Sequence, residues 1–546
     1  MRKALIPMLA SALALLGCAS DCNNNKAITC NKVADDLSHG FTNEPRIPTS
    51  FANDTDLIMS KAYWNVWNEK VQKEIDERIE KYRKANASLK IADIDTSKSV
   101  KIKQVSHKFI FGAHIFNFNQ LGKKEYNDTY KSLYGSLFNS ATIAFYWKTF
   151  EMEFDKMRFE TEYWDTEEFW NNVKHAKTMP HWRRPSTDQI VEFCEQKGIR
   201  MHGHPLVWGN RRWHCPELQI FQEYALNNEQ IRTGHKCGRS TADTAPYMAY
   251  EKTYKKIPLA EFEKRFANIA DVMKERTEIR IREIAKRYGD KIHSWDVVNE
   301  SARDFELGNL PSKSKKITRS LYGIMEPDYD FNAFMMAQKY LPKKALLNIN
   351  DYNTNNSYLQ QIESLSKRGC EIDIVGAQMH LFNPKLTLAM SNGDFSNPQL
   401  AKQTPTKIKE IMDNLSKSGK PIHLSEITVT AAGTSHKDRM KQAVALRNLY
   451  RMWFSIEKMM GITMWNVVDD CGAPGEPTMS GLFTRDMQPK PAYHAINNLI
   501  NKEWKTNIIT NADTNGNVAF RGFKGKYEIS YTDKNGKQKT ITYNLE

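Results

Sequence analysis

The sequence predicts an α/β fold in which a parallel sheet closes into a (β/α)8 (TIM) barrel. Short apolar, β-branched runs that are typical of buried strands alternate with helix-like patterns. This alternation repeats eight times between Phe109 and Asp469, which suits a (β/α)8 barrel enlarged by insertions. The eight predicted strands are Phe109–Ile115, Ala141–Trp147, Ile199–Trp208, Ile292–Glu300, Ala345–Asn353, Ile372–His380, Ile422–Thr428 and Gly461–Asp469.

The start of the chain predicts export. Residues 1–17 combine a basic start at Arg2 and Lys3 with an apolar stretch too short to span a bilayer, as in a signal peptide. The tetrapeptide Leu15-Leu16-Gly17-Cys18 resembles a bacterial lipobox, which implies cleavage before Cys18 and lipidation of its thiol; the alternative is a plain secretory signal. We therefore expect an exported lipoprotein of the cell envelope, at the outer membrane on its periplasmic or surface face, with a lipid anchor as its one contact with the membrane.

Four further parts follow the signal. Residues 18–60 are polar and predict a flexible tether. Residues 61–107 predict an amphipathic helix over Tyr63–Asn86 and a small hairpin over Leu89–His107. Residues 108–503 hold the barrel, and 504–546 a C-terminal β appendage with a hairpin turn at Lys534–Lys537. The strands of the appendage are expected at Asn517–Phe523, Lys526–Thr532 and Lys539–Asn544.

Composition excludes several function classes. The chain has 78 Lys and Arg against 64 Asp and Glu among 546 residues, but the excess is scattered, which argues against nucleic-acid binding. It has no Gly-rich phosphate loop, no Cys-x-x-Cys and no His-Glu-x-x-His, so we expect no cofactor and no metal. We also expect a monomer. Cys215 and Cys237 could close a polar insertion and Cys22 and Cys30 could pair in the tether, but spacing does not decide connectivity.

Two predicted strands end in a carboxylate. Ile292–Glu300 finishes with Asn299 and Glu300, and Ile422–Thr428 delivers Glu426 after a polar residue. A Glu at a strand end must be solvated, partnered or held neutral as an acid. A single Glu of this kind is explained equally well as a residue exposed to water. Two of them are more informative, because polar residues at the strand ends of a barrel gather at one face. We therefore expect Glu300 and Glu426 to share one cleft.

The other strand ends supply groups that suit a sugar. Two carboxylates without a metal are what glycosidic bond cleavage requires. Amides and imidazoles bind ring hydroxyls, and indoles pack against the C–H face of a sugar ring. Each such residue alone is more often part of a core, but together they predict a sugar site. They are His202, His204, Trp208, Asn299, Asn350–Asn353, Gln378, His380 and Trp465. Two insertions, Thr149–Arg184 and Arg211–Pro258, are expected to overhang the cleft.

From Phe109 to Leu499 the chain resembles glycoside hydrolase family 10, best known for endo-β-1,4-xylanases that are (β/α)8 barrels acting with retention. The motifs are Phe111-Gly112, Lys148, His202-Gly203-His204-Pro205-Leu206-Val207-Trp208, Trp295-Asp296-Val297-Val298-Asn299-Glu300, Asn350-Asp351-Tyr352-Asn353, Gly376-Ala377-Gln378-Met379-His380, Ser425-Glu426, Thr463-Met464-Trp465 and Lys490-Pro491-Ala492-Tyr493. The resemblance implies Glu300 as acid/base and Glu426 as nucleophile. It also implies that Lys148, His204, Trp208, Asn299, Tyr352, Gln378, His380 and Trp465 bind the substrate.

The departures from the family pattern concern the groove. Ala144 and Phe145 replace the usual Glu-Asn, Gly209 and Arg211 replace His and Gln, Thr428 replaces an Asp, and the second Trp of the last strand's loop is missing from Asp470–Ala473. Losing the Glu-Asn pair removes hydrogen bonds to a sugar, so we expect weak activity on linear xylan. Phe145 could stack on a sugar ring or fill space, and restoring the pair by Ala144→Glu with Phe145→Asn is expected to shift activity toward xylan.

The leading interpretation is a lipid-anchored retaining glycosidase that acts on a β-linked plant polysaccharide, with xylan as the family's usual substrate. One alternative is a family 10-like enzyme for a different or branched β-glycoside. Another is a non-catalytic glycan-binding protein at the cell surface. The presence of both Glu300 and Glu426 argues against a binding protein, because binding alone needs neither an acid nor a nucleophile.

Overall fold

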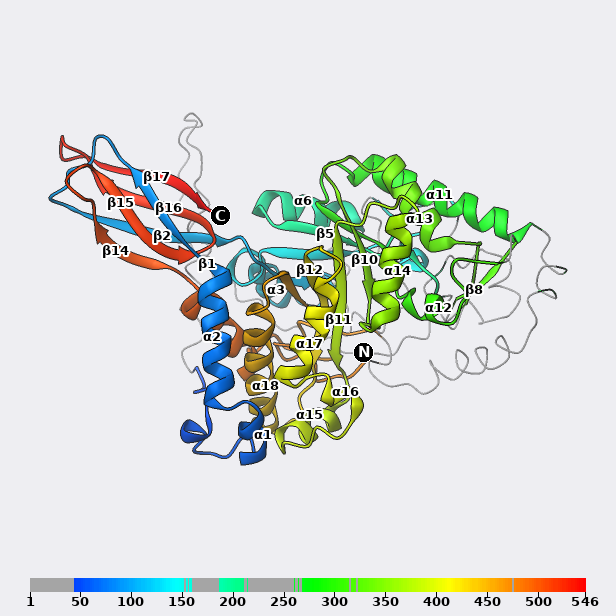
Figure 1. Cartoon of the computed structure of the whole chain (residues 1–546), viewed down its shortest axis with the longest axis horizontal. Helices are drawn as coiled ribbons and strands as arrows, with labels where there is room; N and C mark the ends of the chain where they lie inside the picture. The colour runs from blue at the N-terminus through cyan, green and yellow to red at the C-terminus, as the bar shows by residue number, and fades with distance from the viewer. Residues whose placement is uncertain are drawn as a thin grey trace, which may run out of the picture.

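The computed structural model describes residues 44–546 except 152–153, 156, 160–185, 211–213, 215–259, 261–263, 265–267, 314–315, 321–322 and 474–475. The centre of the molecule is a closed parallel barrel of eight strands, which confirms the predicted fold (Figure 1). Each predicted run supplies one strand of the barrel, and β13 returns to pair with β3. The strands are β3 (Ile110–His114), β4 (Ser140–Ala144), β5 (Arg200–His204), β7 (Ser294–Asn299), β10 (Leu346–Asp351), β11 (Ile374–Leu381), β12 (Ile422–Val429) and β13 (Met459–Met464).

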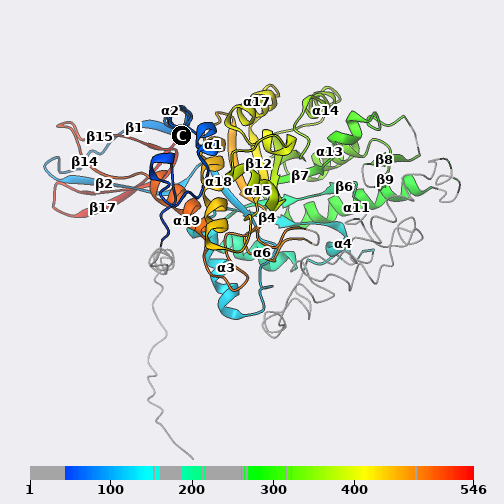
Figure 2. The same ribbon diagram turned by 90° about the horizontal axis from the view of Figure 1, so that it is seen from below.

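Helices surround the barrel on its outer side (Figure 2). They are α3 (Lys124–Ser136), α6 (Thr187–Lys197), α11 (Ile269–Tyr288), α13 (Tyr329–Tyr340), α14 (Asn356–Lys367), α17 (Pro405–Ser416), α18 (His436–Phe454) and α19 (Pro491–Asn498). Shorter elements follow individual strands: α4 (Trp147–Phe150), β6 (Val207–Trp208), α12 (Ala302–Glu306), β8 (Thr318–Ser320), β9 (Gly323–Met325), α15 (Pro384–Ser391) and α16 (Pro398–Ala401). The π-helical turn Leu499–Glu503 directly continues α19. Among the described residues no helix has both the length and the apolar character to cross a bilayer.

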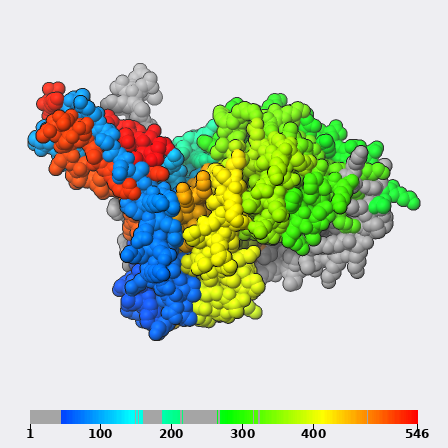
Figure 3. Space-filling model, in the orientation of Figure 1, coloured from blue at the N-terminus to red at the C-terminus, as the bar shows by residue number. Residues whose placement is uncertain are grey.

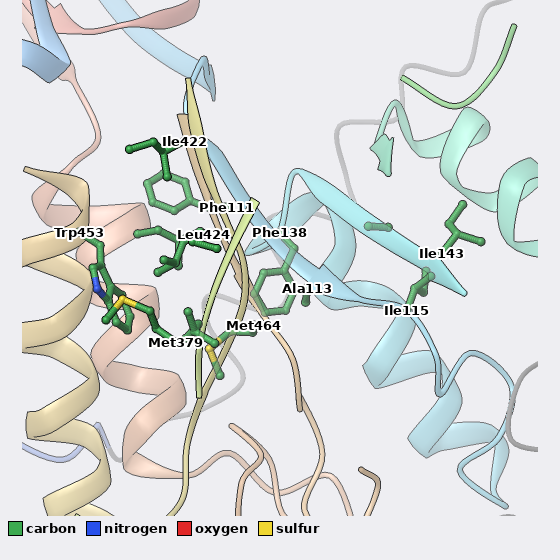
Figure 4. Packing of buried hydrophobic residues seen from close by; sticks show 14 of the residues in the cluster. Phe111, Ala113, Ile115, Phe138, Ile143, Met379, Ile422, Leu424, Trp453 and Met464 are labelled. Carbon is green, nitrogen blue, oxygen red and sulfur yellow. The ribbon is translucent and has the colours of Figure 1, made fainter. Parts of the chain in front are cut away.

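The barrel strands are buried on both faces, as expected for a parallel sheet covered by helices. Every residue of β12 is buried, and its apolar side chains belong to one continuous core. Figure 4 shows part of this core, with Phe111, Ile422, Leu424 and Met464 of the strands near Trp453 of α18. Burying one such large side chain contributes roughly 1.5–3 kcal/mol, so the core holds the strand ends in fixed positions.

The segment before the barrel folds as two helices, whereas a single helix was predicted over Tyr63–Asn86. An irregular 3-10 turn, Phe51–Asn53, precedes α1 (Lys61–Val66) and α2 (Glu69–Arg83). The side chain of Asn68 accepts a hydrogen bond from the Val71 amide and so begins α2. Helix α2 lies along α18, where Arg451 pairs with Asp76 (Figure 1).

Strands from both ends of the chain form one small β unit that projects from the barrel (Figure 3). The strands are β1 (Lys84–Lys90), β2 (Ser99–His107), β14 (Asn507–Asn511), β15 (Asn517–Phe523), β16 (Gly525–Thr532) and β17 (Gln538–Leu545). The three strands expected in the appendage are present, and β16 and β17 form the predicted hairpin. The hairpin predicted over Leu89–His107 is wrong, because β1 pairs with β15 while β2 pairs with β14 and β16. Alternation shows that a strand has one buried face but does not identify its partner.

Several predictions fall outside the described residues. These are the signal with Cys18, the first part of the tether, the four cysteines proposed to pair, Arg211 and most of the two insertions. Of the cysteines that the structure describes, Cys194, Cys370 and Cys471 are free and buried.

Candidate active site

A cavity of about 520 Å³ lies at the carboxyl ends of the barrel strands. Both predicted carboxylates, Glu300 and Glu426, line it. The cavity also contains seven of the eight residues predicted to bind substrate: His204, Trp208, Asn299, Tyr352, Gln378, His380 and Trp465. Lys148 lies in α4, and its side chain is outside the described part of the structure. His202 is buried beneath the cavity and does not line it.

Glu300 has an unusual backbone. It follows the last residue of β7 and adopts a left-handed conformation with φ of 57°, while its amide donates to the carbonyl oxygen of Asn350 at 2.8 Å. Such a conformation costs a non-glycine residue of order 1–3 kcal/mol, and it is most often found at functional sites. Here the left-handed residue stands at the end of β7, and its carboxyl group faces the cavity.

The carboxyl group of Glu300 has two hydrogen-bond donors. Trp208 donates from Nε1 to Oε2 at 3.1 Å, and Gln378 donates from Nε2 to Oε1 at 3.2 Å. Loss of contact with bulk water raises the pKa of Glu300 to about 8, and the charges of Glu426 and Asp351 act in the same direction. Glu300 is therefore protonated at neutral pH, which is the state required of a general acid.

Glu426 has more polar partners than Glu300. Its Oε1 accepts from Asn350 Nδ2 at 2.8 Å and from Gln378 Nε2 at 3.0 Å, and its Oε2 lies 3.2 Å from His380 Nε2. Burial raises the pKa of Glu426 to about 7; His204 and Asn350 oppose this rise, and Asp296 and Glu476 add to it. Because hydrogen bonds to a carboxylate favour its charged form, we assign the negative charge of the pair to Glu426.

His204 is held in place from below. Its Nδ1 lies 2.6 Å from Asp296 Oδ2, and its Nε2 lies 3.8 Å from Glu426 Oε1. His202 Nε2 is 3.0 Å from the same oxygen of Asp296. Burial favours the neutral form of Asp296, but the two imidazoles hold the pKa of this carboxyl well below its usual range. A carboxylate at Nδ1 fixes the orientation of the imidazole, so that Nε2 faces the nucleophile candidate.

Aromatic rings form the other wall of the cavity. Tyr146, Trp208, Phe382 and Trp465 line it, and Phe116 is buried behind Tyr146 and Trp465. Trp465 donates from Nε1 to Oε1 of Glu476 at 3.2 Å. Indole and phenol rings of this kind offer flat apolar surfaces to the C–H face of a sugar.

Phe145 does not take part in this wall. It has no exposed surface and its ring packs against Trp295, Phe150 and Tyr288 at centroid distances of 5.1, 5.3 and 5.7 Å. Of the two roles considered for Phe145, the structure therefore supports space filling and excludes stacking on a sugar. The next residue, Tyr146, lines the cavity instead.

Sequence reasoning assigned no role to several residues of this region, among them Asp296, Tyr146, Glu476, Lys402 and Gln403. Asp296 had a signal, because an Asp inside an apolar strand needs a buried partner. Glu476 and Gln403 had none, since both lie in connections without periodicity. Among the described residues no group of His, Cys, Asp and Glu is arranged to hold a metal ion.

Comparisons with known proteins point to one family. Residues 252–499 match the model of glycosyl hydrolase family 10. The chain is 25% identical over 323 residues to endo-1,4-beta-xylanase A of Caldicellulosiruptor sp., covering 57% of this chain and 38% of that protein. It is 30% identical over 219 residues to endo-1,4-beta-xylanase A of Halalkalibacterium halodurans, covering 39% and 45%. The chain thus spans less than half the length of these two relatives.

Native xylanase 10B from Thermotoga maritima is similar with 20% identity and a TM-score of 0.46, over 72% of this chain and 96% of that one.

Proposed function

Because the chain is a divergent member of glycosyl hydrolase family 10, we propose that it is a retaining glycoside hydrolase that cleaves a β-linked plant polysaccharide, with xylan as the reference substrate. In this proposal Glu300 protonates the oxygen of the departing sugar while Glu426 attacks the anomeric carbon. Glu300 then removes a proton from the water that releases the sugar from Glu426. His204, Asn299 and Gln378 would bind the hydroxyls of the sugar under attack.

The observation that carries this proposal is the amide of Gln378. Its Nε2 donates to Oε1 of Glu300 at 3.2 Å and to Oε1 of Glu426 at 3.0 Å. Because both bonds share Nε2, the distance between the two carboxyl oxygens cannot exceed the sum of these two donor–acceptor distances. That limit lies below the roughly 6.5–9.5 Å that inverting enzymes need to fit a water molecule, and allows the about 5–5.5 Å of retaining enzymes.

The protonation states support the same division of labour. A retaining enzyme needs one carboxyl protonated and the other ionised at its working pH. Burial and the neighbouring carboxylates raise the pKa of Glu300 to about 8. Burial also raises the pKa of Glu426, to about 7, but the amides of Asn350 and Gln378 donate hydrogen bonds that favour its charged form. A protein that only binds glycans has no use for this arrangement, which is why we favour an enzyme over a binding protein.

Turnover and stereochemistry test the proposal. We expect cleavage of aryl β-xylosides and xylo-oligosaccharides, with the β anomer formed first, as followed by proton NMR. Glu426→Ala should abolish turnover of both substrates. Glu300→Ala should spare the glycosylation step for aryl glycosides with good leaving groups more than for poor ones. An initial α anomer, or equal losses for good and poor leaving groups in pre-steady-state kinetics of Glu300→Ala, would refute the mechanism.

We also infer that the protein works at the cell envelope, on the outer membrane, held by lipid on Cys18. Support comes from the lipobox-like residues 15–18 and the polar stretch after them, which would give a tethered barrel access to long polymers. The proposed partner is thus a polysaccharide or oligosaccharide.

A further inference from the structure

The wall of the cavity beyond β11 comes from α16 and the two residues that follow it. Asn397 caps α16 by accepting a hydrogen bond from the Gln399 amide, and Pro398 occupies the first turn. The side chain of Gln399 donates from Nε2 to the carbonyl oxygen of His380 at 3.0 Å, which ties α16 to the end of β11. Lys402 and Gln403, the two residues after α16, are thereby held at the same cavity as Glu300 and Glu426.

Lys402 is the one Lys or Arg among the described residues that line the cavity. Within the described part of the chain it forms no hydrogen bond or ion pair through its side chain, although the surface lysines of the following helix do: Lys407 pairs with Glu410 and Lys409 with Asp413. An ammonium group on a cavity wall without a carboxylate partner is open to a negatively charged ligand.

Gln403 provides a second, independent observation. Only 3% of its surface is exposed, and its Oε1 is fully buried with no hydrogen-bond partner in the described structure. Buried amide groups are nearly always satisfied, so an orphaned one beside a cavity indicates a missing partner. The amide offers one acceptor and two donors, which suits a group that carries hydroxyl and carboxylate oxygens together.

The charges of the remaining cavity restrict where an anion can bind. Glu426, which carries the negative charge of the catalytic pair, and Glu476 both line it, so a carboxylate ligand would be repelled from their side of the cavity. The ammonium group of Lys402 makes the wall after α16 the part of the cavity that attracts an anion. A neutral pentose or hexose has no need of this cation, whereas a uronic acid has both the carboxylate for Lys402 and the hydroxyls for Gln403.

We propose that Lys402 and Gln403 form a subsite for a carboxylate-bearing sugar, so that the preferred substrate carries a uronic acid unit or branch. The proposal rests on the glycosidase function proposed above and specifies its substrate class. Lys402 pairs with the carboxylate of the sugar, and the amide of Gln403 bonds to an adjacent hydroxyl.

The test uses three matched oligosaccharides on the full-length protein. The first is a β-1,4-xylo-oligosaccharide with one glucuronic acid branch, the second is the same molecule with the carboxyl group reduced to an alcohol, and the third is the unbranched chain. We expect kcat/KM for the acidic compound to exceed that for its reduced form by about ten-fold or more, since one charge-assisted hydrogen bond accounts for such a factor. This ratio should fall toward one in Lys402→Met and recover in Lys402→Arg.

Lys407→Met is the control, because Lys407 is exposed on α17 and does not line the cavity. It should leave the acidic-to-reduced ratio unchanged. Gln403→Met, which keeps the volume of the side chain, should lower kcat/KM for both branched compounds relative to the unbranched one. A ratio near one in the unmodified protein, or a ratio that survives Lys402→Met, overturns the proposal.

A failure of the proposed function is recognised separately. If neither these three compounds nor the aryl β-xylosides are cleaved, the proposed function with xylan as its reference substrate is wrong, and calorimetric titration of the three oligosaccharides still decides the subsite. Tighter binding of the acidic compound that depends on Lys402 supports the subsite, and equal binding of the acidic and reduced forms rejects it.

Discussion

Phe145 and Tyr146 are neighbours in the sequence, but Phe145 belongs to the core and Tyr146 lines the cavity. Replacing each of them should therefore have a different effect. Phe145 has no exposed surface and contacts three aromatic rings within 5.7 Å, so Phe145→Ala leaves a cavity in the wall of the barrel. Such truncations cost about 3–5 kcal/mol. For a domain of this size 1 kcal/mol lowers Tm by about 2 °C, so we expect a fall of about 6–10 °C. Well below that Tm, kcat/KM per folded molecule should change little.

Tyr146 should behave in the opposite way. Its ring lines the cavity at 5.5 Å from the ring of His204 and 5.8 Å from that of Trp208. Loss of a stacking surface worth about 0.5–1.5 kcal/mol should lower kcat/KM of Tyr146→Ala by about 2- to 10-fold. Thermal unfolding by circular dichroism and initial rates on xylo-oligosaccharides measure both quantities. An unchanged Tm with a ten-fold loss of kcat/KM in Phe145→Ala would show that the assignment of the two residues is reversed.

The same packing changes the outlook for restoring a xylan-binding pair. The sequence suggested that Phe145→Asn with Ala144→Glu would shift activity toward xylan. In the structure an amide at position 145 would lie among Trp295, Phe150 and Tyr288 without a partner. Burying an unpaired amide costs about 1–3 kcal/mol in addition to the lost packing. We now expect the double variant to lose stability without gaining xylanase activity.

Three further predictions concern the carboxylates and the anchor. Asn350→Ala removes the donor at 2.8 Å from Glu426 and should lower kcat/KM about ten-fold or more, with Tm measured as the control for misfolding. Activity should fall below the pKa of Glu426, where the nucleophile is neutral, and above the pKa of Glu300, where the acid is ionised. Glu476→Gln removes a charge that raises the pKa of Glu426, so the acidic limb of the pH–rate profile should move to lower pH while the alkaline limb stays. An acidic limb that does not move would contradict this prediction. Cys18→Ser should move the protein to the soluble fraction or leave its signal uncleaved, and normal processing with unchanged membrane partitioning would show that the lipobox interpretation is wrong.

The strands and the two carboxylates could be predicted from sequence because each depends on a local pattern. An apolar run of five to eight residues between helical patterns identifies a buried strand, and the fold then places Glu300 and Glu426 at one face. The alternation of residues along the second predicted strand also indicates that Phe145 is buried. Ala141, Ile143 and Phe145 alternate along one predicted strand and so share a face, and the first two have no exposed surface. Extending that alternation by one residue assigns Phe145 to the core.

Other features depend on contacts that no local pattern records. The partners of β1 and β2 lie more than 400 positions away in the sequence, as the bond from Gln104 to Lys524 illustrates with a separation of 420. The site residues Glu476 and Gln403 come from connections whose course is set by tertiary packing. The left-handed backbone of Glu300 is likewise held by Asn350 on the neighbouring strand. Gly is the usual sequence signal of such a conformation, and position 300 is a Glu.

The pairing of β2 with β16 has a consequence for synthesis on the ribosome. The 420 positions that separate Gln104 from Lys524 take roughly 20–80 s to translate, and β2 has no partner during that time. An unpaired strand is a template for aggregation, and natural sequences counter it with lysines. Strand β2 carries Lys101 and Lys103 on its exposed face, opposite the buried Val100 and Ile102. These two charges make premature pairing between nascent chains unfavourable until the end of the polypeptide arrives to complete the sheet.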